Sequence, residues 1–389
     1  MSRRLTVITE IIAPYRVPVF NALARERGID LHVIFLSETD PKLRLWPIYK
    51  DEINFSYEVL PSWRARIGRQ TLLLNRGLGR ALRNSHPDVV VCGGYNYPAS
   101  WQALSWAKLH GVPFVAWIES TSREQRSSAF PIQLAKRFFV HACDAFLVPG
   151  KASAAYLQVL GAASRQIFVA ANAVDTEFFA AGAARARLNP AATRSHFGLP
   201  SRFFLFVGRL IETKGVFDLV EAYGRLSPEL RREIGLVFVG DGHARDQISR
   251  QAAKIDPATI LVLGFLQRDH LSQLYGLAEA LVFPTHSDAW GLVVNEAMAC
   301  RLPVITTDVA GCQLDLVHHA ENGFVIPARD LTALTECMER LASDPGLREH
   351  MGRRSADLIS QYSPQNCAAG FASLHCENLQ GAPRWKPVA

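Results

Sequence analysis

The stretch Phe283–Gly311, FPTHSDAWGLVVNEAMACRLPVITTDVAG, carries the strongest signal for the fold and for a site. It begins at the end of an apolar strand, crosses a polar loop, enters a helix and returns as the apolar strand PVITT. The first backbone amides of a helix suit an anionic group such as a phosphate, and nearby carboxylates accept hydrogen bonds from sugar hydroxyls. The pattern therefore indicates a nucleotide-sugar site. The residues concerned are the carboxylates Asp288 and Glu296, eight positions apart, and the amides of Gly291, Leu292 and Val293.

Two cations follow another apolar strand, FFLFVG, earlier in the chain. Arg209 and Lys214 lie five positions apart just past its end, in the sequence GRLIETKG. At this spacing both side chains can reach one pyrophosphate, the arginine as a planar fork and the lysine as a mobile point charge. We therefore expect them to bind the phosphates of the same ligand.

Short apolar runs alternate with longer mixed segments, and a chain of 389 residues is too long for one ordinary core. Runs of four to six apolar residues are typical of parallel strands buried on both faces. The rhythm breaks at the Ala-, Gly- and Pro-rich segment 180–201, which we expect to join two domains. The sequence predicts an α/β fold with two doubly wound Rossmann-like domains facing a cleft. The expected strands are LTVIT, LHVIFL, DVVVCG, PFVAWI, AFLVPG and IFVAAN before the break, and FFLFVGRL, GLVFVGDG, TILVLGF, ALVFPT, PVITTD and FVIPA after it.

The run WGLVVNEAMA followed by the strand PVI resembles the glutamate-x7-glutamate region of family 4 glycosyltransferases, the group 1 glycosyl transferases. GRLIETKG likewise matches the GRL-x3-KG motif of that family. The resemblance covers essentially the whole chain and implies the GT-B architecture. It assigns residues 1–180 to an acceptor-binding domain and 200–362 to a nucleotide-sugar-binding domain. It assigns 363–389 to a C-terminal helix that crosses back to the first domain, and a tail.

The resemblance also implies roles for individual residues of the second domain. Arg209 and Lys214 bind the donor diphosphate and offset charge on the departing nucleotide, so they count as catalytic and as donor-binding. Asp288 contacts the sugar ring as a further catalytic residue, although the family usually has glutamate there, and a helix cap is its alternative role. Glu296 holds the ribose hydroxyls. The remaining donor-binding positions are Gly240, Asp241, Gly264, Leu266, Gly291, Leu292 and Val293.

The candidate residues of the first domain depart from the family pattern. Glu119 ends the strand PFVAWIES, where many members have a histidine near the reacting sugar. We expect Glu119 to act as a catalytic base for the acceptor hydroxyl or to orient a substrate, with a structural helix cap as the alternative. The family's glycine-rich first loop is missing, and Arg16 is its expected replacement as a contact for an acceptor or donor phosphate. Tyr95 is expected to line the acceptor side.

Charge is unevenly distributed along the chain. Residues 1–190 contain 23 Lys and Arg against 14 Asp and Glu, whereas residues 191–389 contain 19 against 22. A basic half on an enzyme suggests an anionic partner, either a membrane surface or an acidic acceptor. The candidate contacts are Arg64, Arg66 and Arg69, for which a solvated surface is the alternative. Nucleic acid is not expected as a partner, because no binding module accompanies the charge.

No metal or other cofactor is expected. The sequence lacks the Asp-x-Asp pair with which metal-dependent transferases hold a divalent ion, and the cations Arg209 and Lys214 can offset the same charge. Seven cysteines without a CxxC pair indicate reduced thiols. No apolar run approaches the roughly 18 residues that span a bilayer, and Glu10 interrupts the first one. We therefore expect a cytoplasmic protein, peripheral on the inner membrane face.

These observations predict a retaining, metal-independent hexosyltransferase. It would move a hexose from a nucleotide sugar to an acceptor hydroxyl, on a lipid-linked saccharide or glycolipid of cell-surface polysaccharide biosynthesis. Retention is implied by the resemblance alone. A nucleotide-sugar epimerase, which shares the fold, and a non-catalytic nucleotide-sugar or glycan-binding protein remain as alternatives. A dinucleotide oxidoreductase is disfavoured, because no GxGxxG run follows an early strand.

Overall fold

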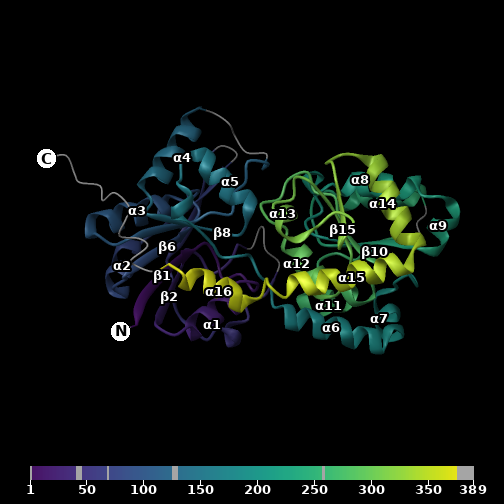
Figure 1. Cartoon of the computed structure of the whole chain (residues 1–389), viewed down its shortest axis with the longest axis horizontal. Helices are drawn as coiled ribbons and strands as arrows, with labels where there is room; N and C mark the ends of the chain where they lie inside the picture. The colour runs from purple at the N-terminus through teal and green to yellow at the C-terminus, as the bar shows by residue number, and fades with distance from the viewer. Residues whose placement is uncertain (1, 41–45, 68–69, 125–129, 256–258, 375–389) are drawn as a thin grey trace. The chain divides into compact units, whose positions relative to one another are not determined.

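The computed structural model describes residues 2–40, 46–67, 70–124, 130–255, 259–374 of the chain (Figure 1). It divides into two compact units. The first comprises Met1–Ser122, Arg126–Ala173 and Pro364–Ala389, and the second comprises Arg123–Gln125 and Val174–Ser363. Each unit is built around one parallel sheet.

The sheet of the first unit has the strand order β3-β2-β1-β6-β7-β8-β9, and every neighbouring pair is parallel. The chain runs outward from β1 in one direction and then returns to fill the other side, so the order reverses between β1 and β6. An antiparallel hairpin, β4–β5, lies outside this sheet. The strands are β1 (Arg3–Thr9), β2 (Ile29–Phe35), β3 (Ser56–Val59), β4 (Ser62–Ile67), β5 (Gln70–Asn75), β6 (Val89–Gly93), β7 (Phe114–Trp117), β8 (Ala145–Val148) and β9 (Ile167–Val169).

Both faces of this sheet are covered, because successive side chains of a strand point to opposite faces. Helices α2–α5 bury one face, which includes Ile8, and α1 with α16 bury the other, which includes Val7 (Figure 1). Helix α16 is the last helix that the structure describes, and its Phe371 ring lies 4.9 Å from that of Trp117. The helices are α1 (Val17–Arg25), α2 (Leu78–Ser85), α3 (Pro98–His110), α4 (Phe130–Ala142), α5 (Lys151–Leu160) and α16 (Pro364–Ala372), with 3₁₀ turns η1 (Lys50–Glu52) and η2 (Ser164–Gln166).

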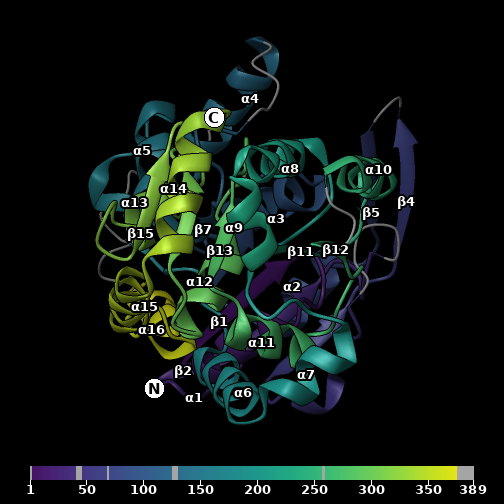
Figure 2. The same cartoon turned by 90° about the vertical axis from the view of Figure 1, so that its right-hand side faces the viewer.

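The second unit repeats this plan with the order β12-β11-β10-β13-β14-β15, again all parallel. Here the order reverses between β10 and β13, and in open α/β sheets ligands bind outside the strand ends at such a reversal. Figure 2 shows α8 and α14 on one side of the sheet and α11 and α12 on the other. The strands are β10 (Phe203–Val207), β11 (Gly235–Val239), β12 (Ile260–Val262), β13 (Ala280–Phe283), β14 (Val304–Thr307) and β15 (Gly323–Ile326).

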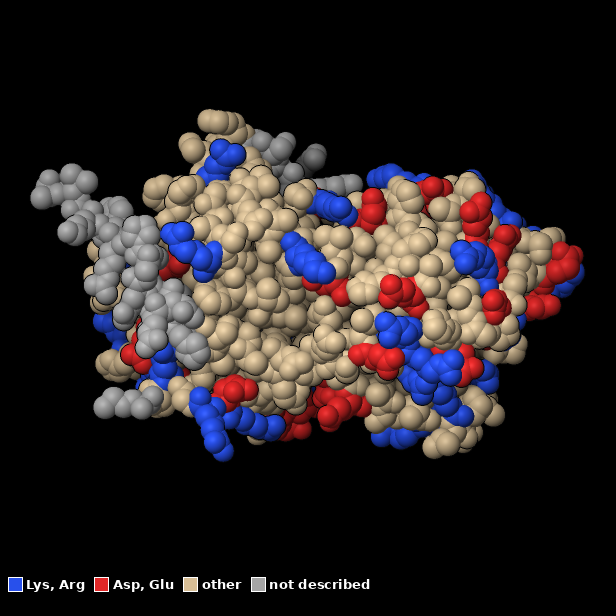
Figure 3. Space-filling model, in the orientation of Figure 1, with Lys and Arg blue, Asp and Glu red and all other residues tan. Residues whose placement is uncertain are grey.

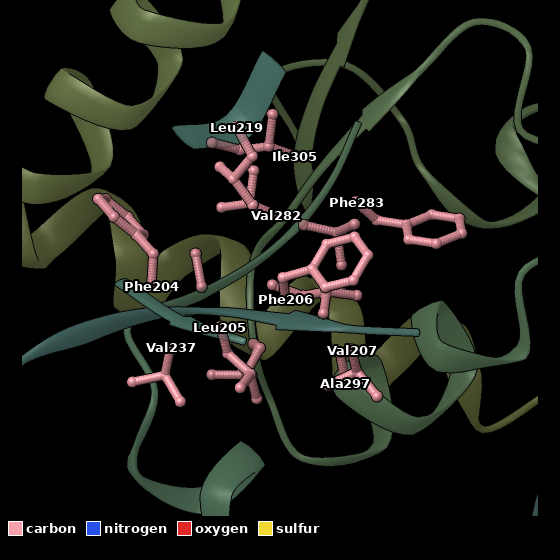
Figure 4. Packing of buried hydrophobic residues seen from close by; sticks show 14 of the residues in the cluster. Phe204, Leu205, Phe206, Val207, Leu219, Val237, Val282, Phe283, Ala297 and Ile305 are labelled. Carbon is pink, nitrogen blue, oxygen red and sulfur yellow. The ribbon is translucent and has the colours of Figure 1, made fainter. Parts of the chain in front are cut away.

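The core of the second unit explains the continuous apolar run FFLFV in β10 (Figure 4). Phe204 and Phe206 point to the face that Leu219 of α8 covers, whereas Leu205 and Val207 point to the face that Ala297 of α12 covers. The helices are α6 (Thr176–Leu188), α7 (Pro190–Phe197), α8 (Val216–Arg225), α9 (Pro228–Glu233), α10 (Arg245–Ile255), α11 (Arg268–Leu277), α12 (Leu292–Ala299), α13 (Gln313–Leu316), α14 (Leu331–Ser343) and α15 (Pro345–Ile359), with the 3₁₀ turn η3 (Glu212–Lys214).

The predicted α/β fold with two Rossmann-like domains is confirmed, but the boundary differs from the expected one. The division lies between Ala173 and Val174, and segment 180–201 is largely α6 and α7 of the second unit. Its small residues serve packing: a Cβ on Gly182 of α6 would lie 2.1 Å from the side-chain oxygen of Ser272 in α11. The composition that suggested a linker is therefore that of a close helix–helix contact.

Gly276 of α11 lies in the same contact between α6 and α11, and its substitution tests how close that contact is. A Cβ there would lie 2.7 Å from the carbonyl oxygen of Ala183, so Gly276→Ala should cost about 1–3 kcal/mol and lower the melting temperature. In Gly79→Ala of α2 the nearest atom is 3.9 Å away, and helix propensity should raise stability by about 0.5–1 kcal/mol. Thermal unfolding followed by circular dichroism measures both shifts. Equal shifts in the two variants would contradict the close contact of α6 and α11.

Candidate active site

The candidate site of the second unit lies where the strand order reverses, at the carboxyl ends of β10 and β13. A loop leaves each of these strands, and two hydrogen bonds to one backbone carbonyl join the two loops. The amide of His286 donates to the carbonyl of Thr213 at 2.9 Å, and the hydroxyl of Thr285 donates to the same carbonyl at 3.2 Å. Gly215 is required at this junction, because a Cβ there would lie 1.9 Å from the carbonyl oxygen of Pro284. The two loops therefore form one rigid edge.

The first loop presents Arg209 on a glycine-lined turn. Its side chain is exposed, whereas the backbone beside it is fixed by the loop after β11. The amide of Leu210 donates to the carbonyl of Asp241 at 2.9 Å, and a Cβ on Gly240 would lie 1.8 Å from the carbonyl oxygen of Gly208. Gly240 and Asp241 thus support the arginine loop through the backbone. The Asp241 carboxylate is exposed and accepts from the amide of Gly242 at 2.8 Å.

Lys214 and Asp288 form an ion pair between the two loops. The Lys214 Nζ lies 2.6 Å from the Asp288 Oδ2 and also donates to the carbonyl of Ser287 at 2.8 Å. The lysine is 8% exposed, so its ammonium has little water and depends on these oxygens. The two residues that the sequence assigns separately to the diphosphate and to the sugar are therefore in direct contact.

The loop that carries Asp288 is held as a short extension of the sheet. Asp288 forms a parallel bridge with Ala310, and the amide of Gly311 donates to its carbonyl at 3.1 Å. A Cβ on Gly311 would lie 1.8 Å from the carbonyl oxygen of Ala289, so only glycine allows this approach. The Asp288 Oδ1 accepts from the amide of Trp290 at 3.1 Å. The carboxylate is thereby fixed by the loop itself and does not cap the helix.

Helix α12 begins at this platform without a capping side chain. Gly291 is its N-cap, in the left-handed region at φ 98°, and no side chain caps the first turn. The first amide groups of a helix without a capping side chain are available to an anion, and the helix dipole favours negative charge there. Gly291, Leu292 and Val293 therefore keep the predicted capacity to bind a phosphate.

Glu296 lies one turn into α12 with its carboxylate half-buried. Its Oε2 accepts from the Tyr275 hydroxyl of α11 at 2.8 Å. Burial raises the pKa of the Glu296 carboxyl from 4.5 to about 7, and the tyrosine hydrogen bond opposes this shift. The carboxyl therefore changes protonation near neutral pH.

Gly264 and Leu266 follow β12 at the edge of the same site. Gly264 adopts φ 77°, and its carbonyl accepts from the amide of Gly240 at 2.8 Å. Leu266 is partly buried against the core of the second unit. The backbone of this loop is thus coupled to the turn that supports Arg209.

Arg16 and Glu119 form a second ion pair, within the first unit. The Arg16 guanidinium lies 2.7 Å from the Glu119 Oε1 and 3.8 Å from the centre of the Trp117 ring. Glu119 lies two residues past the carboxyl end of β7, and Arg16 is the N-cap residue of α1. Arg16 and Glu119 were expected separately, as a phosphate contact and as a catalytic carboxylate. In the structure each neutralises the other, so a substrate must compete for either charge.

Tyr95 is buried, with 7% exposure, and its ring centre is 5.9 Å from that of Phe139. Burial raises the pKa of its hydroxyl to about 12. Tyr95 lines a pocket within the first unit together with Trp101 and Lys136.

Arg64 of the basic hairpin is largely engaged within its own unit. It donates to the carbonyl of Thr39 at 3.0 Å and lies 3.5 Å from the Asp40 carboxylate. The side chain of Arg66 and the whole of Arg69 lie outside the described residues. In the part of the chain that the structure describes, no group of three His, Cys, Asp or Glu could hold a metal, and no helix is long and apolar enough to cross a membrane.

Three functional candidates were not predicted from the sequence. Tyr275 reads as a core aromatic at helical spacing, and Trp117 as part of an apolar strand. His286 lies in the stretch Phe283–Gly311, just past the end of a strand, where a polar residue indicates a candidate site residue. Its Nε2 is 2.7 Å from the Asp218 Oδ2, which ties the second loop to α8.

Two family models match the chain: "Glycosyl transferases group 1" over residues 193–357 and "Glycosyltransferase Family 4" over residues 19–178. A glycogen synthase of Mycobacterium tuberculosis is 27% identical over 320 residues, which is 78% of this chain and 72% of that protein. A capsular polysaccharide biosynthesis glycosyltransferase, CapM, of Staphylococcus aureus is 30% identical over 167 residues, which is 41% of this chain and 42% of that protein.

The fold is shared with solved glycosyltransferases. The Anabaena protein Alr3699/HepE in complex with UDP-glucose superimposes with a TM-score of 0.72 at 18% identity, covering 95% of this chain and 100% of that one. The predicted GT-B architecture is thereby confirmed, as is the resemblance on which the site assignments rest.

The shifted pKa of Glu296 predicts a pH-dependent stability. A carboxyl that titrates near 4.5 when unfolded and near 7 when folded contributes stability that is fully present below pH 4.5 and is lost as pH rises through 7. Glu296→Gln has no such proton to lose. As the pH rises from about 5 to about 8, the melting temperature of the variant should therefore increase relative to that of the wild type. A difference that stays constant over this range would contradict the raised pKa.

Proposed function

The chain belongs to glycosyltransferase family 4, and we propose that it transfers a hexose from a nucleotide sugar to an acceptor hydroxyl with retention of the anomeric configuration. The observation that carries this proposal is the arrangement at the β10–β13 reversal. Three features lie together at the carboxyl ends of these strands: an exposed Arg209, the Lys214–Asp288 pair and the uncapped start of α12. Such a site offers charge to a diphosphate and a carboxylate to a sugar.

In the proposed mechanism the donor diphosphate binds at the start of α12, where Arg209 and Lys214 reach its oxygens. As the bond between the anomeric carbon and the phosphate breaks, these charges stabilise the nucleotide diphosphate. The acceptor hydroxyl enters on the face that the diphosphate leaves. Catalysis of this kind consists of positioning and electrostatics, so no protein nucleophile is required.

The remaining residues of the site serve the two ends of the donor. Glu296 accepts hydrogen bonds from the ribose hydroxyls, and accepts them most strongly in its ionised form. Asp288 contacts the sugar ring once phosphate takes over Lys214. Because two cations and a helix N-terminus already offset the diphosphate charge, we propose a metal-independent reaction. The complex of the similarly folded Alr3699/HepE with UDP-glucose supports a UDP-hexose as the first donor to test.

For the acceptor we propose a lipid-linked saccharide or glycolipid of cell-surface polysaccharide biosynthesis. The named activity of the relative CapM and the excess of positive charge in residues 1–190 support this choice. The protein would act in the cytoplasm at the inner membrane face. In the first unit, Glu119 would take the acceptor proton or orient a substrate, and Arg16 would hold it in place or bind an acceptor phosphate.

The first experiment offers UDP-, GDP- and ADP-hexoses to the protein with membrane extract as acceptor and EDTA present. Turnover of one donor supports a metal-independent transferase and identifies its sugar. Conversion of the donor without any acceptor would instead favour an epimerase. Binding of one nucleotide sugar with no turnover for any acceptor would favour a non-catalytic binder.

Lys214→Ala tests the diphosphate assignment. The variant should lose about 10²–10³-fold in transfer rate, because one preorganised charge at the leaving group is removed. The matched control is Lys254→Ala, at an exposed lysine of α10 in the same unit, which should keep full activity. Thermal unfolding establishes that both variants are folded. Activity retained in Lys214→Ala would remove the assignment.

Glu119→Gln separates a base from an orienting residue. The amide keeps the shape and can still accept a hydrogen bond from Arg16, but it cannot take a proton. If Glu119 is the base, transfer should fall by about 10²–10⁴-fold while donor affinity, measured by calorimetry, stays unchanged. A variant that transfers at the wild-type rate would limit Glu119 to orientation.

A further inference from the structure

Helix α4 of the first unit exposes an apolar stripe. Phe130, Leu134 and Phe138 are 78%, 57% and 67% exposed and follow one another at intervals of four residues, so they lie along one face of the helix. Ile132 is 41% exposed on another side of the helix, where it lines a pocket. The opposite side of the same helix contributes Phe139 to the core. An exposed face of a helix in water normally carries charged and polar residues, so this second apolar face needs a partner.

The charge on α4 is of one sign. Its sequence, FPIQLAKRFFVHA, contains Lys136 and Arg137 and no aspartate or glutamate. Arg137 is exposed next to the stripe. In Figure 3 the described part of the surface at α4 is tan and blue. Within α4 the apolar side chains are accompanied by basic charges and no acidic ones. This combination matches the boundary of an anionic lipid leaflet, where apolar groups enter the acyl region and cations meet phosphates.

A pocket of about 320 Å³ adjoins the stripe within the first unit and is lined mainly by apolar atoms. Ile132 and Lys136 of α4 line one side, and Tyr95 and Trp101 line the other. The Trp101 ring stacks on that of Phe138, 6.4 Å between centres and 6° between planes, so the pocket and the stripe are continuous.

Lys136 places a positive charge in this pocket. It is 8% exposed, its Nζ donates to the Tyr156 hydroxyl at 3.1 Å, and it lies 5.7 Å from the centre of the Tyr95 ring. It forms no ion pair with a carboxylate of the described residues. Neutral oxygens and ring faces compensate a buried ammonium only in part, so an anionic ligand would gain from binding there.

We propose that Phe130, Leu134, Phe138 and Arg137, named here the α4 surface, bind an anionic phospholipid of a membrane leaflet, with one lipid phosphate at Lys136 in the adjoining pocket. This inference deepens the proposed function and rests on it for the lipid-linked nature of the acceptor. It moves the membrane contact from the basic hairpin, whose Arg64 is engaged with Thr39 and Asp40, to α4. The exclusively basic charge of the helix favours a lipid over a protein partner.

The test compares vesicle binding of the full chain with two sets of substitutions. One variant carries Phe130→Ser, Leu134→Ser and Phe138→Ser. The matched control carries Leu109→Ser and Val159→Ser, at side chains of α3 and α5 in the same unit that are 81% and 69% exposed. Sedimentation with vesicles of phosphatidylcholine, with and without phosphatidylglycerol, measures binding.

Wild type and control should bind the anionic vesicles, and the stripe variant should bind them at least about tenfold more weakly. Lys136→Gln and Arg137→Gln should each reduce the preference for anionic over neutral vesicles, with folding checked by thermal unfolding. Equal binding of the stripe variant and the control would overturn the proposal, as would wild-type binding that ignores lipid charge. Self-association of the wild type that the stripe substitutions abolish would also overturn it, because the stripe would then be an interface between copies of the chain.

Calorimetry with UDP separates this inference from the proposed function. Affinity for UDP should be the same in wild type, stripe variant and control, because α4 and the donor site lie in different units. Vesicle binding that depends on the stripe, in a protein that binds no nucleotide sugar, would sustain the α4 surface and reject the transferase. Nucleotide binding with vesicle binding that is indifferent to the stripe would do the reverse.

Discussion

The ion pair between Lys214 and Asp288 joins the two loops on which the donor site depends. It spans the point where the strand order reverses, and it uses a lysine that is almost without water. A buried cation is stable only with its counter-charge in place, so the pair fixes the loops as well as the charges. The backbone reinforces this at Gly215 and Gly311, which leave no room for a side chain. A phosphate that approaches Lys214 therefore exchanges one anion for another in a site that is already shaped.

The first unit repeats the principle with Arg16 and Glu119. Each unit thus has, just past the carboxyl end of a strand, a cation and a carboxylate that form an ion pair with each other. Each ion pair holds both of its charges in place, and a substrate that binds either charge must first break the pair. Removing one partner of either pair leaves the other charge unmatched.

Most of the fold and much of the site could be predicted from local signals. The apolar runs that form β10 and β13, and the charged residues just after them, are contiguous in sequence and need no partner to be recognised. The pairings could not be predicted, since Lys214 meets Asp288 across 74 residues and Arg16 meets Glu119 across 103. The role of Tyr275 could not be predicted, because the sequence pattern of a buried aromatic residue on a helix does not depend on whether its hydroxyl donates to a carboxylate. The segment 180–201 does not mark the domain boundary that its composition suggests, because small residues favour both linkers and tight helix contacts.

Helix α16 has a consequence for the order in which the protein matures. It reaches the first unit only after the whole second unit has left the ribosome, and it then covers the face of Trp117 with Phe371. Until that moment the indole that supports Arg16 is open to water on that side. The first unit is thus begun first and completed last.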